Sequence, residues 1–254
     1  MNKTAKGRSE LSRAGPIPLK NLDVEPVVGR RTIQEGVYQG LSHALMTGRF
    51  DPGQTLTISS LSELFGTSHM PVREALRRLA AENAVEIAST GSARVPNVSR
   101  ARLDDLYNAR VIVEGAATEM AVPNINAQQI RALEYNLADH LAAGREDNIQ
   151  ALMTKNQEFH FIIYRASRSE VLVQLVEALW LRFGPYLRML SMHMEPLLKS
   201  KNAETYTRHH QLMIDALKRK DTADVREHMI NDIKTTHALL QTLVTANDKL
   251  SRDL

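Results

Sequence analysis

The chain of 254 residues contains no cysteine. This absence excludes disulfide-stabilised folds, thiolate nucleophiles and cysteine-ligated zinc fingers, so any metal ion has to be bound by histidine, carboxylate or amide groups. Long apolar runs are also missing, since no stretch approaches the roughly 18 residues of a membrane helix. The N-terminus "MNKTAKGRSELSRAG" lacks the apolar segment of a signal peptide. We expect a cytoplasmic protein without a membrane partner.

A large excess of charge of one sign is missing too, with 32 Lys and Arg against 29 Asp and Glu. The small positive excess lies entirely in residues 1–98, which hold 12 basic and 9 acidic residues, whereas residues 99–254 hold 20 of each. A basic N-terminal part favours a polyanionic partner such as nucleic acid. An excess of three charges is also ordinary for a solvated surface, so the charge alone does not establish a nucleic-acid partner.

Residues 1–28 are polar and interrupted by glycine and proline, which predicts a flexible arm. A separate unit is predicted over residues 29–98, where apolar spacing first indicates a helix at 31–47. "TISSLSELFG" and "VREALRRLAAEN" predict two short helices joined by a tight turn, with Ser60 and Ser68 as their N-terminal caps. "AVEIA" and "ARVPN", separated by "STGS", predict a hairpin.

This order of helices and hairpin is that of a winged helix-turn-helix, whose second motif helix enters the major groove of DNA. The predicted recognition helix carries His69, Arg73, Arg77 and Arg78, with Arg73 and Arg77 on one face. Arginine forks onto guanine or neutralises phosphate, and Arg94 in the hairpin would reach the DNA backbone or minor groove. The alternative is a solvated amphipathic helix without a partner.

The remainder of the chain shows only helical periodicity. Six helices are predicted, at 102–121, 127–143, 147–167, 169–194, 203–218 and 222–246. The segment "RFGP" at 182–185 predicts a kink in the fourth of them. Helices of this number and length enclose a core, so residues 102–246 are predicted to form an all-helical bundle. The predicted fold class is mainly α.

The stretch "LMTGRFDPGQTLTISSLSELFGTSHMPVREALRRLAAENAVEIASTGSARV" resembles the DNA-binding domain of the GntR family of bacterial transcription regulators. Its "PG" turn, its "SxxPVREALRRL" helix and the glycine of its hairpin carry the resemblance. The helical remainder resembles the FCD ligand-binding domain of the FadR subfamily. Ser59 and His69 replace arginines that the family commonly has, which implies a different operator, while Thr90 and Gly91 match its wing tip. The complete set of predicted DNA-contacting residues is Ser59, Ser68, His69, Arg73, Arg77, Thr90, Gly91 and Arg94.

The histidines of the helical part suggest a metal site. His210 and His228 lie nine residues on either side of a break near Arg219, so in an antiparallel helix pair they stand at one level, ~14 Å from the turn. Asn156 and His160 share a face of an earlier helix. Three imidazole nitrogens and one amide oxygen suit zinc, nickel or manganese, and the FCD resemblance implies the same positions. A hydrogen-bonded pocket without metal is the alternative.

The resemblance also implies that Arg110, in "LYNARVIVEG", points into an effector pocket, and Arg188 is a second candidate. An arginine beside a metal suits a carboxylate ligand, such as a small organic acid or sugar acid.

The predicted function is a transcriptional regulator, more specifically a repressor, that binds a palindromic double-stranded operator as a homodimer and responds to this effector. Two alternatives stay open. One is a metal-dependent enzyme in which His160, His210 and His228 activate a water, and the other is an architectural DNA-binding protein without effector control.

Overall fold

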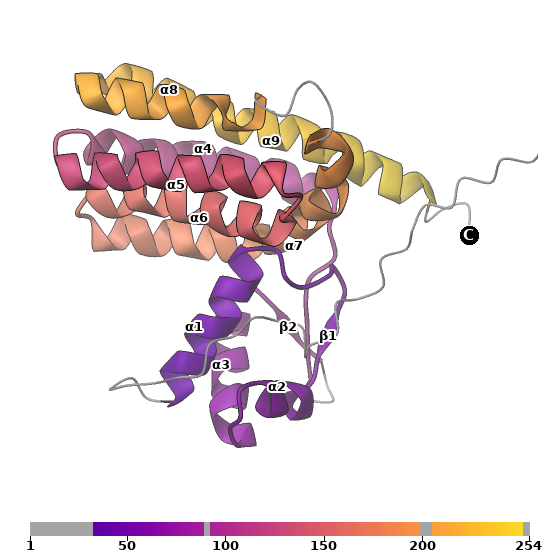
Figure 1. Cartoon of the computed structure of the whole chain (residues 1–254). Coiled ribbons are helices and arrows are strands. Elements are labelled where there is room, and N and C mark those ends of the chain that lie inside the picture. The colour runs from indigo at the N-terminus through magenta and orange to yellow at the C-terminus, as the bar shows by residue number, and fades with distance from the viewer. Residues whose placement is uncertain (1–32, 89–91, 199–204, 251–254) are drawn as a thin grey trace, which may run out of the picture.

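The computed structural model describes residues 33–88, 92–198 and 205–250. The predicted arm at 1–28 and the predicted wing-tip residues Thr90 and Gly91 lie outside the described residues. Within them, a small N-terminal unit of helices and short strands packs beneath a larger helical bundle (Figure 1). This mainly helical architecture confirms the predicted fold class.

The N-terminal unit is a winged helix-turn-helix. The three strands form one antiparallel sheet in the order β1-β3-β2, and Arg94 of the central strand pairs with Thr55 on one side and Glu86 on the other. The buried residues of this unit are predominantly apolar, as expected for a small core stabilised by the hydrophobic effect. The elements are α1 (Ile33–Met46), β1 (Thr55–Leu56), α2 (Ile58–Leu64), α3 (His69–Ala81), β2 (Glu86–Ile87) and β3 (Ala93–Arg94).

The caps of the motif helices differ from the sequence prediction. α2 begins at Ile58 because the hydroxyl of Thr57, not that of Ser60, accepts the capping hydrogen bond, which the Ser60 amide donates at 3.2 Å. Ser68 does stand at the N-cap of α3, but its side chain makes no capping hydrogen bond. Gly66, with φ of 59°, ends the turn after α2 in the left-handed conformation that glycine favours.

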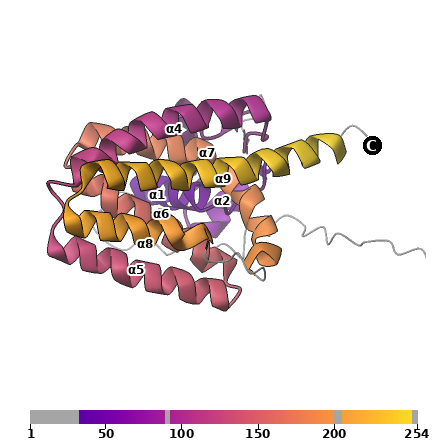
Figure 2. The same cartoon turned by 90° about the horizontal axis from the view of Figure 1, so that it is seen from above.

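The larger unit is a ring of helices. Neighbouring pairs run α4–α9, α9–α8, α8–α5, α5–α6, α6–α7 and α7–α4, which closes the ring around one hydrophobic core. Figure 2 shows α9 and α8 side by side, flanked by α4 and α5. The bounds, which agree with the predicted helices to within a few residues, are α4 (Arg100–Ala121), α5 (Ala127–Arg145), α6 (Ile149–Ala166), α7 (Glu170–Leu198), α8 (Thr205–Arg219) and α9 (Thr222–Leu250).

α7 joins the bundle to the winged helix. Its last turns leave the direction of its first part (Figures 1 and 2), as the proline of the "RFGP" segment predicts. A Cβ on Gly184 would lie 2.3 Å from the Leu45 carbonyl oxygen at the end of α1, and a Cβ on Gly48 would lie 2.8 Å from the Arg188 amide nitrogen. Glycine at both positions therefore permits the backbones of α1 and α7 to approach closely.

None of the helices in the described ranges is both long and apolar enough to cross a membrane.

Candidate metal and DNA-binding sites

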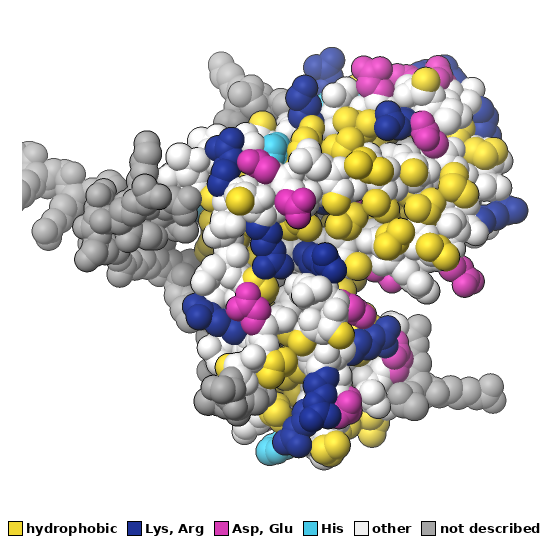
Figure 3. All heavy atoms as spheres, turned by 180° about the vertical axis from the view of Figure 1, so that it is seen from behind, with side chains coloured by type: hydrophobic (Ala, Val, Ile, Leu, Met, Phe, Trp, Pro, Cys, Tyr) yellow, Lys and Arg dark blue, Asp and Glu magenta, His cyan; other side chains and the backbone are white. Residues whose placement is uncertain are grey.

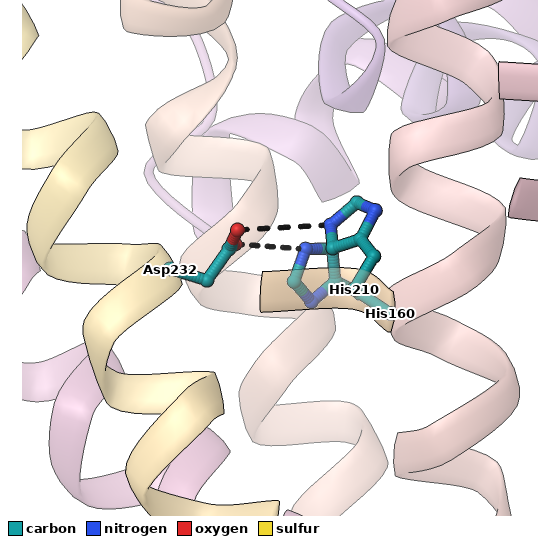
Figure 4. A group of neighbouring side chains, drawn as sticks. All are labelled: His160, His210 and Asp232. Carbon is teal, nitrogen blue, oxygen red and sulfur yellow. Dashed lines mark ion pairs between the residues drawn. The ribbon is translucent and has the colours of Figure 1, made fainter. Parts of the chain in front are cut away.

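Three helices of the ring bring His160 of α6, His210 of α8 and Asp232 of α9 together (Figure 4). We call these three residues the His–His–Asp cluster. Their potential ligand atoms all lie within 4.8 Å of one another. Nε2 of His160 is 3.3 Å from one Asp232 carboxylate oxygen, and Nε2 of His210 is 3.7 Å from the other. Both imidazoles are buried, so the cluster is a polar centre inside the bundle.

The electrostatics of the cluster favour an ionised Asp232 carboxylate. Burial by itself raises the pKa of Asp232, but the hydrogen bond with His160 and the charges of His210 and His160 outweigh it and bring this pKa to about 2. Burial lowers the pKa of His210 well below its ordinary value of 6.5, and that of the neighbouring His140 to about 4. Neither ring nitrogen of His210 has a hydrogen-bond partner, which is costly for a fully buried side chain.

A buried hydrogen-bond network continues from His160 toward α4. The Tyr164 hydroxyl donates to a Glu114 carboxylate oxygen and lies 3.2 Å from Nδ1 of His160. Glu114 in turn accepts from Arg110, whose Nε lies 2.5 Å from Oε1 and whose Nη2 lies 3.2 Å from Oε2. Burial, and secondly the negative charge of Glu114, raise the pKa of Tyr164 well above 10, so its hydroxyl stays protonated. The charge of Arg110 is balanced by Glu114.

A cavity of about 50 Å³ adjoins the cluster, enough for a few water molecules or a small ligand. Predicted site residues Arg110 and Asn156 both line it, together with His160 and Asp232. Its apolar wall comes largely from α7. The α7 residues that line the cavity are Trp180, Phe183, Leu187, Leu190 and Met194.

The structure brings together His160 and His210 as predicted, but not His228. Nε2 of His228 lies 3.1 Å from Asp224 instead, and Asp232 occupies the place in the cluster that His228 was predicted to take. The reason is the exact centre of the turn, which falls between Lys220 and Asp221 rather than at Arg219. Moving the centre by one and a half residues moves the position level with His210 from 228 to 231, which is next to Asp232 and almost one helical turn further along α9.

Arg188 also has a different partner from the predicted effector. Its Nε donates to the Asp51 carboxylate at 2.6 Å, and the pair links α7 to the loop before β1. Because α7 turns successive residues to different sides, Leu187 and Leu190 line the cavity whereas Arg188 faces the winged helix. Arg110 is therefore the predicted effector-binding arginine that reaches the cavity.

Sequence reasoning did not select Asp232, Glu114, Tyr164 or His140. Signals for two of them were present: Glu114 follows Arg110 by four residues, and Asp232 interrupts the apolar stripe of α9. The two others are an aromatic residue and a histidine on buried faces of their helices, where their hydrogen-bond partners depend on the neighbouring helices.

On the opposite side of the molecule, α3 presents His69, Arg73 and Arg77 to solvent. The other face of α3 is buried in the core through Val72, Ala75, Leu76 and Leu79. Figure 3 shows Lys and Arg side chains gathered near the end of the winged helix that is remote from the bundle. These exposed cations match the predicted recognition surface.

Three arginines of this unit, Arg77, Arg78 and Arg94, differ in their contacts. Arg77 pairs with the partly exposed Glu74 at 2.7 Å, and Nε of Arg94 donates to the Gly53 carbonyl at 3.2 Å. Arg78, by contrast, pairs with Glu35 and Glu82 and lies 3.5 Å from the centre of the Tyr38 ring. Arg78 thus belongs to the packing between α1 and α3. Ser59 and Ser68 are exposed near the starts of α2 and α3.

Comparison with known families decides the class of protein. Residues 33–95 match the bacterial regulatory proteins of the gntR family, and residues 105–235 match the FCD domain. The chain belongs to the GntR family of regulators. The matched ranges confirm the predicted pair of a GntR DNA-binding domain and an FCD domain.

Individual relatives of this GntR-family regulator agree. It is 31% identical over 204 residues to the HTH-type transcriptional regulator McbR of Escherichia coli K12, covering 80% of this chain and 90% of McbR. It is 26% identical over 218 residues to the HTH-type transcriptional repressor GlaR of the same organism, covering 83% of this chain and 96% of GlaR.

The structure of E. coli McbR/YncC superposes with a TM-score of 0.79 at 29% identity, covering 84% of this chain and 99% of that one. These relatives are transcription regulators. The chain is a regulator with an FCD effector-binding domain, and the metal-dependent enzyme alternative is not supported.

Proposed function

We propose that this regulator is a homodimeric repressor whose DNA affinity is set by a small anionic metabolite bound at a divalent metal ion in the FCD domain. The observation that carries the proposal is the His–His–Asp cluster, which lies beside a cavity and beneath the helix that contacts the winged helix.

The residues present fit a metal ion. Two imidazoles and one carboxylate are a donor set suited to zinc, nickel or manganese. The buried His210 has no hydrogen-bond partner at either nitrogen, and a metal bond would offset the cost of burying it. Asn156 lines the same cavity and is a candidate for a further oxygen ligand, in place of the predicted His228.

The charges around the cavity favour an anionic effector. A divalent ion with Asp232 as its one carboxylate ligand keeps one positive charge, while Arg110 and Glu114 balance each other. Asn156 adds no charge. A small carboxylate, such as an organic acid or sugar acid, would place an oxygen on the metal and neutralise the remaining charge.

α7 offers a route from the cavity to DNA. Trp180 and Phe183 line the cavity, and between them Leu181 joins the core of the winged helix while Arg182 donates to the Glu82 carbonyl at 3.0 Å. An effector that binds one position of α7 better than another would shift the placement of the winged helix. The change in the free energy of DNA binding cannot exceed the difference between the effector's binding free energies for the two positions.

The exposed face of α3 supports the proposed contacts with the major groove. His69, Arg73 and Arg77 would read bases or bind phosphates, with Ser59, Ser68 and Arg94 nearby and Thr90 and Gly91 at the wing tip. Because Ser59 and His69 carry no fixed positive charge, we expect fewer phosphate contacts than two arginines would make.

An exposed apolar surface on the bundle supports a homodimer. Figure 3 shows apolar side chains spread over the face of the bundle seen from behind. On the adjacent helices α4 and α7, Ile112 is 68% exposed, Val171 is 67% exposed and Leu175 is 48% exposed. Such a patch is unusual on a monomer, and a second copy would cover it and supply the second recognition helix for a palindromic operator.

The repressor assignment draws on GlaR, a relative whose name describes a transcriptional repressor. A compact dimer on an operator blocks polymerase without further contacts, which also favours repression.

The proposal is tested by measuring binding to DNA upstream of the gene, with and without zinc and with a panel of organic and sugar acids. We expect sequence-specific binding that weakens steeply with salt, and an acid that changes it only when zinc is present. Specific binding unaffected by any acid or by a chelator would instead support an architectural protein and overturn the effector proposal.

A further inference from the structure

We infer that Tyr164 is the positioning residue that makes His160 present Nε2, and not Nδ1, to the cavity as a metal-binding lone pair. The inference deepens the proposed function, because it rests on the proposed metal site. It follows from which atoms can donate a hydrogen in the buried series of hydrogen bonds that links Arg110, Glu114, Tyr164 and His160.

Glu114 contributes no hydrogen to this chain of contacts. This side chain is fully buried and accepts two hydrogen bonds from Arg110, so it is an ionised carboxylate that can only accept. The hydroxyl of Tyr164 has a single hydrogen, and it donates this hydrogen to Glu114. Toward His160, the Tyr164 oxygen can therefore act only as an acceptor.

The ring of His160 has to supply the hydrogen of that contact. Nδ1 of His160 lies 3.2 Å from the Tyr164 oxygen, so Nδ1 carries hydrogen and donates. In a neutral imidazole the other nitrogen then bears a lone pair. This nitrogen, Nε2, lies 3.3 Å from an Asp232 carboxylate oxygen.

With a proton on Nε2 this contact is a hydrogen bond to Asp232; without that proton two lone pairs face each other and repel, and a cation in its place removes the repulsion. The network thus prepares the His–His–Asp cluster for a positive charge, which a metal ion or a second proton on His160 can provide. The tautomer is set by Tyr164, which is neither a member of the cluster nor a lining residue of the cavity.

Buried neighbours hold the Tyr164 hydroxyl and its partners in place. Arg110 is 5% exposed and lies 4.2 Å from the centre of the Phe183 ring, and Tyr164 itself is fully buried. The sulfur of Met229 lies 3.4 Å from the Tyr164 hydroxyl on its third side. Packing on three helices therefore leaves the hydroxyl little freedom to turn its hydrogen toward His160.

The test compares Tyr164→Phe with Tyr186→Phe in the full-length protein. Tyr186 is a matched control, since it is also buried in the bundle and its hydroxyl bonds to Ser99, away from the cluster. Zinc affinity is measured by competition with a chelating dye, and nitrogen-15 NMR reports which nitrogen of neutral His160 carries hydrogen. We expect Tyr164→Phe to weaken zinc binding by about 10- to 100-fold and to populate the Nε2–H tautomer. Tyr186→Phe should change neither.

The NMR measurement separates this inference from the proposed metal site. If the wild-type protein binds no zinc but neutral His160 carries hydrogen on Nδ1, and Tyr164→Phe alters this, the positioning role stands and the metal proposal fails. If Tyr164→Phe keeps both the Nδ1–H tautomer and the wild-type zinc affinity, the inference is overturned. Circular dichroism and the melting temperature of both variants verify that the fold is retained.

Discussion

The winged helix keeps its charged groups in contact with water, whereas the bundle encloses several of its own. Every charged side chain in the described part of the winged helix is at least partly exposed, and its core is predominantly apolar. In the bundle, Arg110, Glu114 and His210 are each at most 5% exposed. Groups that read DNA have to meet a large charged partner at the surface, while groups that hold a small ligand act more strongly where water is excluded.

This difference has an energetic meaning. The apolar core of the winged helix stabilises the fold, whereas each buried polar group of the bundle costs free energy unless it is paired. Neither nitrogen of His210 has a hydrogen-bond partner, so burying this side chain costs free energy, and the proposed metal site would offset that cost. Substitutions in the two regions should therefore affect different properties of the protein.

Replacing Asp232 by Asn should weaken zinc binding at least about 100-fold, or about 3 kcal/mol, because it removes the one charged oxygen of the cluster. Asp224→Asn is the matched control, since Asp224 is on the same helix and pairs with His228 outside the cluster. Dye competition measures both affinities. If Asp224→Asn weakened zinc binding more than Asp232→Asn does, His228 and not Asp232 would be the metal ligand, and the proposed cluster would be refuted.

Acid should destabilise the bundle through His140. Burial lowers the pKa of His140 from 6.5 to about 4, so between these values the unfolded chain binds a proton that the folded chain does not. The free energy of unfolding therefore falls as pH decreases through this window, by up to about 3 kcal/mol from this group. Urea unfolding with chelator present, at pH 7 and 4.5, should show a smaller loss for His140→Gln than for wild type. Equal losses would contradict the buried, neutral state of this ring.

Replacing Arg73 by Ala should weaken specific DNA binding by about 1–3 kcal/mol, because an exposed arginine of α3 loses its contact with base or phosphate. Arg78→Ala removes the same charge from the same helix, but Arg78 is held by Glu35 and Glu82. Its main effect should be on stability. Gel retardation and thermal melting measure the two properties, and equal losses of affinity would mean that non-specific charge alone binds DNA.

Replacing Arg188 by Gln should uncouple the two units, because it breaks the pair with Asp51 that links α7 to the winged helix. We expect the ratio of DNA affinities with and without zinc to change by about 0.5–2 kcal/mol, with zinc affinity in the absence of DNA unaltered. Arg165→Gln is the control, since Arg165 lies near Phe161 on α6. An unchanged ratio in Arg188→Gln would show that coupling follows another route.

Much of the fold could be predicted because it depends on local patterns. Apolar spacing along the chain, together with breaks at glycine and proline, indicated each helix of the described bundle to within a few residues. The exposed face of α3 followed from the same period, since Arg73 and Arg77 are four residues apart. The N-cap of α2 was missed because Thr57 and Ser60 both accept this role chemically.

The order of residues was enough to predict a mainly helical DNA-binding regulator in which α3 exposes arginines and His160 and His210 face the interior. The packing of the helices was needed to show that Asp232 and not His228 completes the cluster, and that Arg188 binds Asp51. The physical reason is that helical period is a local property, whereas the level at which two helices meet depends on the turn between them. An error of one or two residues there moves a side chain by a full turn and exchanges one ligand for another.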